Sequence, residues 1–203
     1  MEQEEKKTEQ QSESRWAGTW QQEIYHELKL LVAVLAVVIL VFQFAAQLIV
    51  VVGSSMYPTL HDGDLLMAVR IYGELETGDI VVVHKETDLI QETIIKRVIA
   101  TGGQTVELDY DNNTVYVDGV RLTEPYINLN DLPPEDEGDP MLPKGDIARI
   151  TVPEGSIFVM GDNRNHSTDS RFSYALGLVD EGYVIGKAVF CFWPVSHIKG
   201  LED

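Results

Sequence analysis

The chain has 203 residues, a length that fits one globular domain of ordinary size together with one additional segment. It carries 33 Asp and Glu residues against 15 Lys and Arg residues, a formal net charge of −18, which argues against a nucleic-acid partner because phosphates repel acidic surfaces. Cys191 is the only cysteine, which excludes an intrachain disulfide and a cysteine-rich zinc site.

The N-terminal part of the sequence combines a polar tail with a long apolar run. Residues 1–27 are acidic and rich in Glu and Gln, and this composition predicts a largely disordered tail. Residues 30–52 contain no charged side chain, and a helix of 23 residues reaches roughly 34 Å, enough to cross a hydrocarbon core of about 30 Å. We predict a transmembrane helix over residues 28–48. A buried core helix would show apolar periodicity, and a cleaved signal peptide would end in an A-x-A site; the run has neither.

The distribution of cations around this run predicts its orientation. Arg15 and Lys29 precede the run, whereas the first cation after it is Arg70. Because Lys and Arg favour the cytoplasmic side, we expect a cytoplasmic tail and an extracytoplasmic domain over residues 49–203. The chain is then a single-pass protein of the cell membrane, with the lipid bilayer as a partner.

Beyond the run, short stretches rich in β-branched residues alternate with Gly and Asp clusters, a pattern typical of strands and tight turns. The predicted strands cover residues 80–83, 93–95, 105–108, 114–117, 156–160 and 183–190. Residues 109–113 and 118–119 indicate hairpins, and residues 128–146, rich in Pro, Asp and Glu, indicate an exposed loop. The expected fold class is mainly β, an antiparallel sheet or barrel-like domain behind one N-terminal helix.

Three segments carry residue types that a sheet does not require. In Gly53-Ser-Ser-Met-Tyr-Pro-Thr-Leu60, Pro58 prevents regular structure, so a serine hydroxyl can be exposed; a Ser-rich turn is the alternative. Lys96 lies inside an apolar strand, where burial would lower its pKa and make it a competent general base, with Arg97 expected on the outward face. A lysine that extends to solvent from an edge strand is the alternative.

The third segment is the polar stretch 161–171. Two arginines interleaved with two aspartates predict an ordered ionic network. His166 leaves a Ser-His-Asp arrangement open as an alternative, although a local hydrogen-bonding role is more common for such a residue. The five histidines show no metal-ligand spacing, so no metal site is predicted.

Together these segments resemble the bacterial type I signal peptidases of the Gram-positive-like type. The resemblance lies, in the order of that family, in Ser55-Met-Tyr-Pro-Thr-Leu60, Gly78-Asp-Ile-Val-Val82, Lys96-Arg-Val-Ile99 and Gly161-Asp-Asn-Arg-x-x-Ser-x-Asp-Ser-Arg171. It implies a membrane-bound serine endopeptidase that cleaves signal peptides from secreted preproteins after small residues of the A-x-A type. No cofactor is implied.

The resemblance also implies roles for single residues. Ser55 is the nucleophile, Lys96 is the general base, and the Ser167 hydroxyl hydrogen-bonds the lysine amine. The backbone N–H of Ser55 donates to the oxyanion, and Gly53 occupies a position where some members carry a second hydroxyl donor. An ionic scaffold is implied for Arg97, Asp162, Arg164, Asp169 and Arg171.

The substrate side follows from the same resemblance. Shallow apolar pockets for the small residues before the cut are expected to be lined by Ile49, Val51, Met56, Leu60, Val82 and Ile95. The expected partners are preprotein signal peptides, with the secretion translocon as a further candidate. Two alternatives are a LexA-like self-cleaving Ser-Lys protein and a catalytically inactive membrane-tethered assembly module. The apolar run disfavours the first, and the presence of both Ser55 and Lys96 disfavours the second.

Overall fold

The computed structural model describes residues 2–70, 73–85, 93–127 and 144–201, with side chains described from Trp20 onward except at positions 21 and 42. The chain divides into two compact units, Met1–Ala45 and Ala46–Asp203. Most of the predicted loop 128–146 lies outside the described residues, which resume at Lys144.

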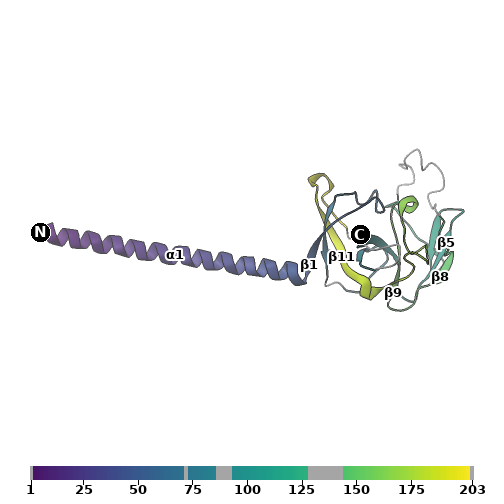
Figure 1. The fold of residues 1–203 in the computed structure, drawn as a ribbon, viewed down its shortest axis with the longest axis horizontal. Helices are drawn as coiled ribbons and strands as arrows, with labels where there is room; N and C mark the ends of the chain where they lie inside the picture. The colour runs from purple at the N-terminus through teal and green to yellow at the C-terminus, as the bar shows by residue number, and fades with distance from the viewer. Residues whose placement is uncertain (1, 71–72, 86–92, 128–143, 202–203) are drawn as a thin grey trace. The chain divides into compact units, whose positions relative to one another are not determined.

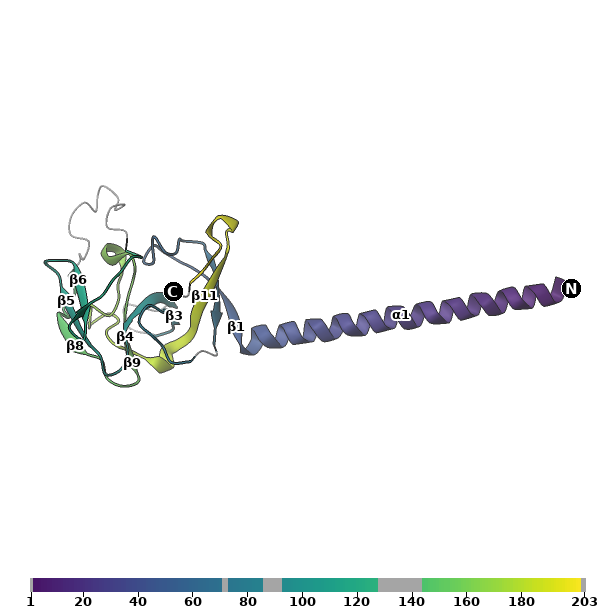
Figure 2. The same cartoon turned by 180° about the vertical axis from the view of Figure 1, so that it is seen from behind.

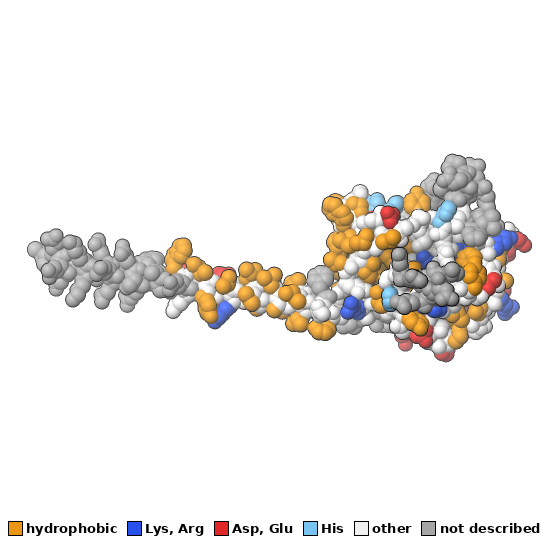
Figure 3. All heavy atoms as spheres, in the orientation of Figure 1, with side chains coloured by type: hydrophobic (Ala, Val, Ile, Leu, Met, Phe, Trp, Pro, Cys, Tyr) orange, Lys and Arg blue, Asp and Glu red, His pale blue; other side chains and the backbone are white. Residues whose placement is uncertain are grey.

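The first unit is one helix, α1 (Glu2–Phe44) (Figure 1). Its segment Gln22–Val41 is long and apolar enough to cross a membrane, and none of this segment is buried. Figure 3 shows apolar side chains over much of the described part of this helix. The tail was predicted to be disordered, but residues 2–27 form the first part of this helix. Their many Glu, Gln and Lys residues have a high helix propensity.

The apolar run does not stay helical to its end. The helix ends at Phe44, and β1 (Ala46–Val50) follows it, so the predicted boundary at residue 48 differs from the structure. β1 pairs antiparallel with β2 (Leu65–Val69) over its whole length. Strand β1 is as apolar as the helix, so a hydropathy pattern joins the two elements into one segment.

Among the described residues, the second unit contains one antiparallel sheet of eight strands in the order β1-β2-β11-β3-β4-β9-β10, with β12 added to β11. Its remaining strands are β3 (Ile80–Val83), β4 (Ile94–Ala100), β9 (Ser156–Met160), β10 (Val179–Asp180), β11 (Val184–Trp193) and β12 (Lys199–Gly200). Short 3-10 helices lie at η2 (Arg164–His166), η3 (Glu181–Tyr183) and η4 (Val195–His197). The sheet curls, as both ribbon views show (Figures 1 and 2).

A smaller antiparallel sheet has the order β7-β6-β5-β8 within the described part of the chain. Its strands are β5 (Thr105–Asp109), β6 (Thr114–Val117), β7 (Val120–Arg121) and β8 (Arg149–Thr151). Figure 2 shows β5, β6 and β8 side by side. Asp118 has φ of 52° and Gly119 has φ of 76°, values that suit the tight turn between β6 and β7.

The predicted fold class, mainly antiparallel β behind one N-terminal helix, is confirmed. Each of the six predicted strands overlaps a strand of the structure, and three have the predicted bounds: β3, β6 and β9. The sequence patterns did not indicate β2, which follows directly after the Ser55 segment. Because β1 and β2 flank that segment, the pair positions the residues described next.

Candidate active site

The segment between β1 and β2, residues 53–64, is closed into a loop by backbone hydrogen bonds; we call it the serine loop. The Val51 N–H donates to the Asp64 carbonyl at 2.8 Å, and the Gly63 N–H donates to the Val51 carbonyl at 2.9 Å. At the start of the loop the Gly53 N–H donates to Asp62 Oδ1 at 2.7 Å, and Gly53 has φ of +87°, a conformation that glycine adopts without strain. Strand pairing therefore fixes both ends of the segment that carries Ser55.

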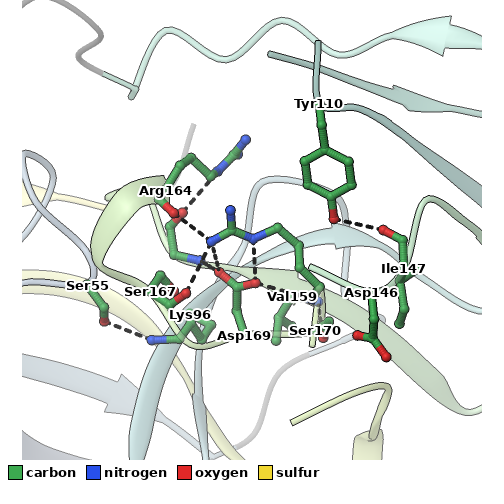
Figure 4. Close-up of polar contacts among 12 residues, drawn as sticks. Ser55, Lys96, Tyr110, Asp146, Ile147, Val159, Arg164, Ser167, Asp169 and Ser170 are labelled. Carbon is green, nitrogen blue, oxygen red and sulfur yellow. Dashed lines mark hydrogen bonds and ion pairs between the residues drawn. The ribbon is translucent and has the colours of Figure 1, made fainter. Parts of the chain in front are cut away.

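Lys96 meets Ser55 from an interior strand of the large sheet. β4 lies between β3 and β9, and the register pairs Lys96 with Val81. The Lys96 side chain is 3% exposed, and its Nζ donates to Ser55 Oγ at 2.8 Å and to the Ile95 carbonyl at 3.2 Å. Figure 4 shows the two side chains directed at each other. The edge-strand alternative for Lys96 does not apply, because β4 is paired on both sides.

The surroundings of the amine favour its neutral form. Burial lowers the pKa of Lys96 to about 8, against the raising effects of Asp169 and Asp162 and with a smaller lowering effect of Arg171. Desolvation is the largest of these effects, since an ammonium ion loses its hydration in this site. A lysine with such a pKa is partly neutral near pH 7 and can accept a proton.

The segment 161–163 binds the serine loop from the other side. The Asn163 N–H donates to the Ser55 carbonyl at 3.0 Å, and the Asn163 side-chain amide donates to the Ser54 carbonyl at 3.1 Å. Gly161 lies so close that a Cβ built on it would be 2.4 Å from the Ser55 carbonyl oxygen and 2.3 Å from Ser167 Oγ. Glycine at 161 thus permits the contact between the two loops.

Ser167 is buried beside this contact, 4% exposed. Within the described residues the hydrogen bonds of the Lys96 amine go to Ser55 and Ile95, so the implied bond from the Ser167 hydroxyl is not formed in this structure. Ser167 Oγ lies at the contact made by Gly161, and the Ser167 carbonyl accepts from Arg171 at 3.1 Å (Figure 4). A supporting role for Ser167 stays a prediction.

The ionic network forms three pairs. Arg97 makes a two-point contact with Asp162, at 2.9 and 2.8 Å. Arg171 contacts Asp169 through Nε at 2.8 Å and through Nη2 at 3.0 Å, and both side chains have no exposed surface. Arg171 also donates to the backbone carbonyls of Arg164 and Ser167, and these contacts hold the polar stretch in place. Removing one partner of a buried ion pair typically lowers the free energy of unfolding by about 3–5 kcal/mol.

Arg164 completes the network with a partner that the sequence patterns did not indicate, Glu124. Tyr126 donates its hydroxyl to Glu124 at 2.9 Å and lies under the Arg97 guanidinium, 3.9 Å from ring centroid to Cζ. The prediction that Arg97 faces outward is wrong: it is 3% exposed. Glu124 and Tyr126 follow β7, far from the arginines in sequence, so no local spacing could have revealed these contacts.

The six residues expected to line substrate pockets gather in one place. A single apolar cluster contains Val51, Met56, Leu60, Val82 and Ile95, with Ile49 packed against it. Ile49 and Val51 come from β1 and its end, Met56 and Leu60 from the serine loop, and the other two from β3 and β4. Met56 directly follows Ser55 and Ile95 directly precedes Lys96, so the cluster includes a sequence neighbour of each.

Comparisons with known proteins find relatives that match most of the chain. A family model described as "Signal peptidase, peptidase S26" matches residues 24–193. "Signal peptidase I" of Bacillus amyloliquefaciens is 37% identical over 202 residues, covering 98% of each chain. "Signal peptidase I T" of Bacillus subtilis is 39% identical over 174 residues, covering 84% of this chain and 86% of the relative.

A solved structure of a signal peptidase I from Enterococcus faecalis is 30% identical and covers 57% of this chain and 97% of its own, with a TM-score of 0.44. The family model spans most of the sequence, and the Bacillus amyloliquefaciens relative extends over nearly all of it. On these matches the chain belongs to the signal peptidase family, peptidase S26, as a relative of the bacterial signal peptidases I.

Proposed function

We propose that this protein is a membrane-bound serine endopeptidase that removes N-terminal signal peptides from secreted preproteins, with Ser55 as nucleophile and Lys96 as general base. The observation that carries the proposal is the 2.8 Å hydrogen bond between a nearly completely buried lysine amine and a serine hydroxyl. A nucleophile within hydrogen-bond reach of a base is the arrangement that acyl transfer requires.

The reaction follows from these two groups. The neutral Lys96 amine takes the proton of the Ser55 hydroxyl while Oγ attacks the scissile carbonyl, and an acyl-enzyme forms when the peptide C–N bond breaks. The ammonium ion returns its proton to the leaving amine. The neutral amine then takes a proton from water, whose oxygen attacks the ester; as the ester C–O bond breaks, the ammonium ion returns this proton to Ser55 Oγ and the acyl product leaves as a carboxylic acid.

The oxyanion of the tetrahedral intermediate needs a donor near Ser55. Among the described residues the Ser55 backbone N–H makes no hydrogen bond, so it is available for this purpose. Gly53 offers no side-chain donor, which leaves the backbone as the main source. Removing one such donor typically costs about 10²- to 10³-fold in rate.

Supporting roles are assigned to the surrounding residues. Ser167 restricts the amine, and the arginine–carboxylate pairs keep the polar stretch rigid. The apolar cluster around Met56 and Leu60 provides shallow pockets for the small A-x-A residues. An extended substrate can add backbone hydrogen bonds beside β1 and β4, in the manner of strand addition.

We place the apolar part of helix α1, residues 28–44, in the bilayer, with residues 1–27 in the cytoplasm and the β domain outside. Ser55 lies shortly after the helix in sequence, which suits a substrate whose own apolar segment occupies the membrane. The bilayer is therefore a partner, and the secretion translocon, which delivers such substrates, is a second.

The test uses the full chain in detergent with a preprotein that carries an A-x-A site, and N-terminal sequencing of the product. Ser55→Ala and Lys96→Met are each expected to lower the cleavage rate by at least about 10³-fold, with unchanged circular dichroism. Lys144→Met, at a surface lysine that is 44% exposed and pairs with Asp111, is the control and should keep full activity.

Cleavage within tenfold of wild type in either active-site variant would exclude the corresponding role. A wild-type protein that cleaves no preprotein would favour the inactive assembly module instead, and cleavage of its own chain alone would favour the LexA-like alternative.

A further inference from the structure

Three side chains outside the Ser55–Lys96 pair meet where the serine loop contacts the segment after β11. His197 Nδ1 lies 2.7 Å from Asp64 Oδ1, although the two residues are 133 positions apart in sequence. His61 Nδ1 lies 3.9 Å from Asp64 Oδ2. One nitrogen or oxygen atom of each residue lies within 4.8 Å of the others. Histidine spacing along the chain had predicted no metal site, because the residues are joined only by the tertiary fold.

A purely structural link between the serine loop and the segment after β11 would not require two histidines. One hydrogen bond from His197 to Asp64 already joins the two segments, and the Lys199 ammonium donates to the Thr59 carbonyl beside it. His61 adds a second imidazole, with its ring centroid 4.4 Å from that of His197. Two imidazoles and one carboxylate converge on the same small volume, which is a ligand set of the kind that binds transition metals.

We propose that His61, Asp64 and His197 form a binding site for a divalent transition-metal ion such as Zn²⁺. Imidazole nitrogen suits Zn²⁺, Cu²⁺ and Ni²⁺, whereas Ca²⁺ and Mg²⁺ prefer oxygen ligands alone. Three protein ligands leave a fourth position of a tetrahedral ion for water.

The burial of the three residues suits an ion that enters from solvent. The Asp64 side chain is 1% exposed, while those of His61 and His197 are 42% and 32% exposed. A backbone hydrogen bond fixes the position of the carboxylate, because Asp64 Oδ2 accepts a hydrogen bond from the His61 backbone N–H at 2.8 Å. It is therefore a fixed ligand, and the two partly exposed rings can rotate toward the ion.

Only small movements are required. Tetrahedral Zn²⁺ with bonds of about 2.0–2.1 Å places neighbouring ligand atoms about 3.3 Å apart. One ligand atom from each of the three residues lies within 4.8 Å of the others, so the longest separation must close by up to about 1.5 Å to reach this tetrahedral geometry. Rotation of partly exposed rings achieves such shifts. A bound ion would then cross-link the serine loop to η4.

The experiment titrates the detergent-solubilised full chain with ZnCl₂ against a chromophoric chelator, and with CoCl₂ to record the visible bands that report nitrogen and oxygen coordination. We expect one ion per chain and a rise in the unfolding temperature with ZnCl₂. His61→Ala and His197→Ala should each weaken binding at least tenfold and abolish that rise.

His84→Ala is the matched control, because His84 is exposed and contacts Thr93 rather than the cluster. It should bind the ion as wild type does. If His197→Ala does not fold, His61→Ala decides, since its ring is the more exposed. The proposal would be overturned if the wild type bound no ion, if both cluster variants bound it with wild-type affinity, or if His84→Ala weakened binding as much as they do. Each result is read from metal binding and the unfolding temperature, so it does not depend on the peptidase activity.

Discussion

At the scale of single residues, the chemistry depends on the protonation state of one amine. The charged form of Lys96 is disfavoured by burial and partly restored by the carboxylates of Asp169 and Asp162, and the balance sets its pKa at about 8. Those carboxylates are neutralised by their own arginine partners, which limits their effect on the amine. Because each carboxylate is paired with an arginine, it raises the pKa of Lys96 less than an unpaired carboxylate would.

This balance predicts the pH dependence of cleavage. Below the pKa of about 8 the amine is protonated and cannot act as a base, so the rate should rise about tenfold per pH unit and level off above that pKa. A pH profile of kcat/KM with a soluble A-x-A peptide measures it. Circular dichroism at each pH serves as the control for unfolding. A rate that stays flat from pH 5 to pH 8 would contradict the role of Lys96.

At the scale of elements, the site depends on contacts between loops that neighbouring strands present. β1 and β2 hold the serine loop, β4 carries the base, and β9 leads directly into the polar stretch that contacts Ser55 through Asn163. The closest of these contacts occurs at Gly161. Real Cβ atoms essentially never come within 3.0 Å of such neighbours, so this position has no room for a side chain.

Gly161→Ala is therefore expected to displace the Ser55 loop and to lower kcat/KM by about 10- to 100-fold, since misplacement by about 1 Å can cost 10²-fold. Gly200→Ala is the control, because a Cβ there meets no atom within 4 Å. Peptide cleavage by the two variants gives the comparison, and thermal unfolding shows whether either change is global. Equal activity in the two variants would mean that the contact at Gly161 is unimportant.

At the scale of the whole molecule, the β unit holds its own core. Each of the three apolar clusters of buried residues is built from positions after Ala45. The unit begins with β1, which pairs with β2 and leads into the buried Val51. Folding of this unit should depend on β1 and not on α1.

A chain starting at Ala46 should accordingly fold and cleave soluble A-x-A peptides, but should no longer partition into membranes. A chain starting at Gly53 lacks β1 and Val51, and loss of buried apolar side chains costs about 2–5 kcal/mol each, so its unfolding temperature should fall steeply. Thermal unfolding, peptide cleavage and vesicle sedimentation of both truncations test this. Equal stability of the two would show that β1 is dispensable.

The sequence by itself determined the elements whose signal is local. Runs of β-branched residues between Gly and Asp turns predicted β3, β6 and β9 with their bounds, because side-chain period and turn chemistry act over a few residues. The order of the Ser55, Lys96 and Gly161–Arg171 segments indicated the family and hence the candidate residues. The boundary between α1 and β1 was not determined, since both are apolar and only pairing with β2 distinguishes them.

The tertiary structure alone decided which side chains meet. Arg97 is buried because Asp162 and Tyr126 cover it, and Arg164 pairs with Glu124 from the segment after β7. The same holds for His61, Asp64 and His197. Such contacts join positions tens to more than a hundred residues apart, and their distances follow from sheet register and loop closure, which no short stretch of sequence encodes.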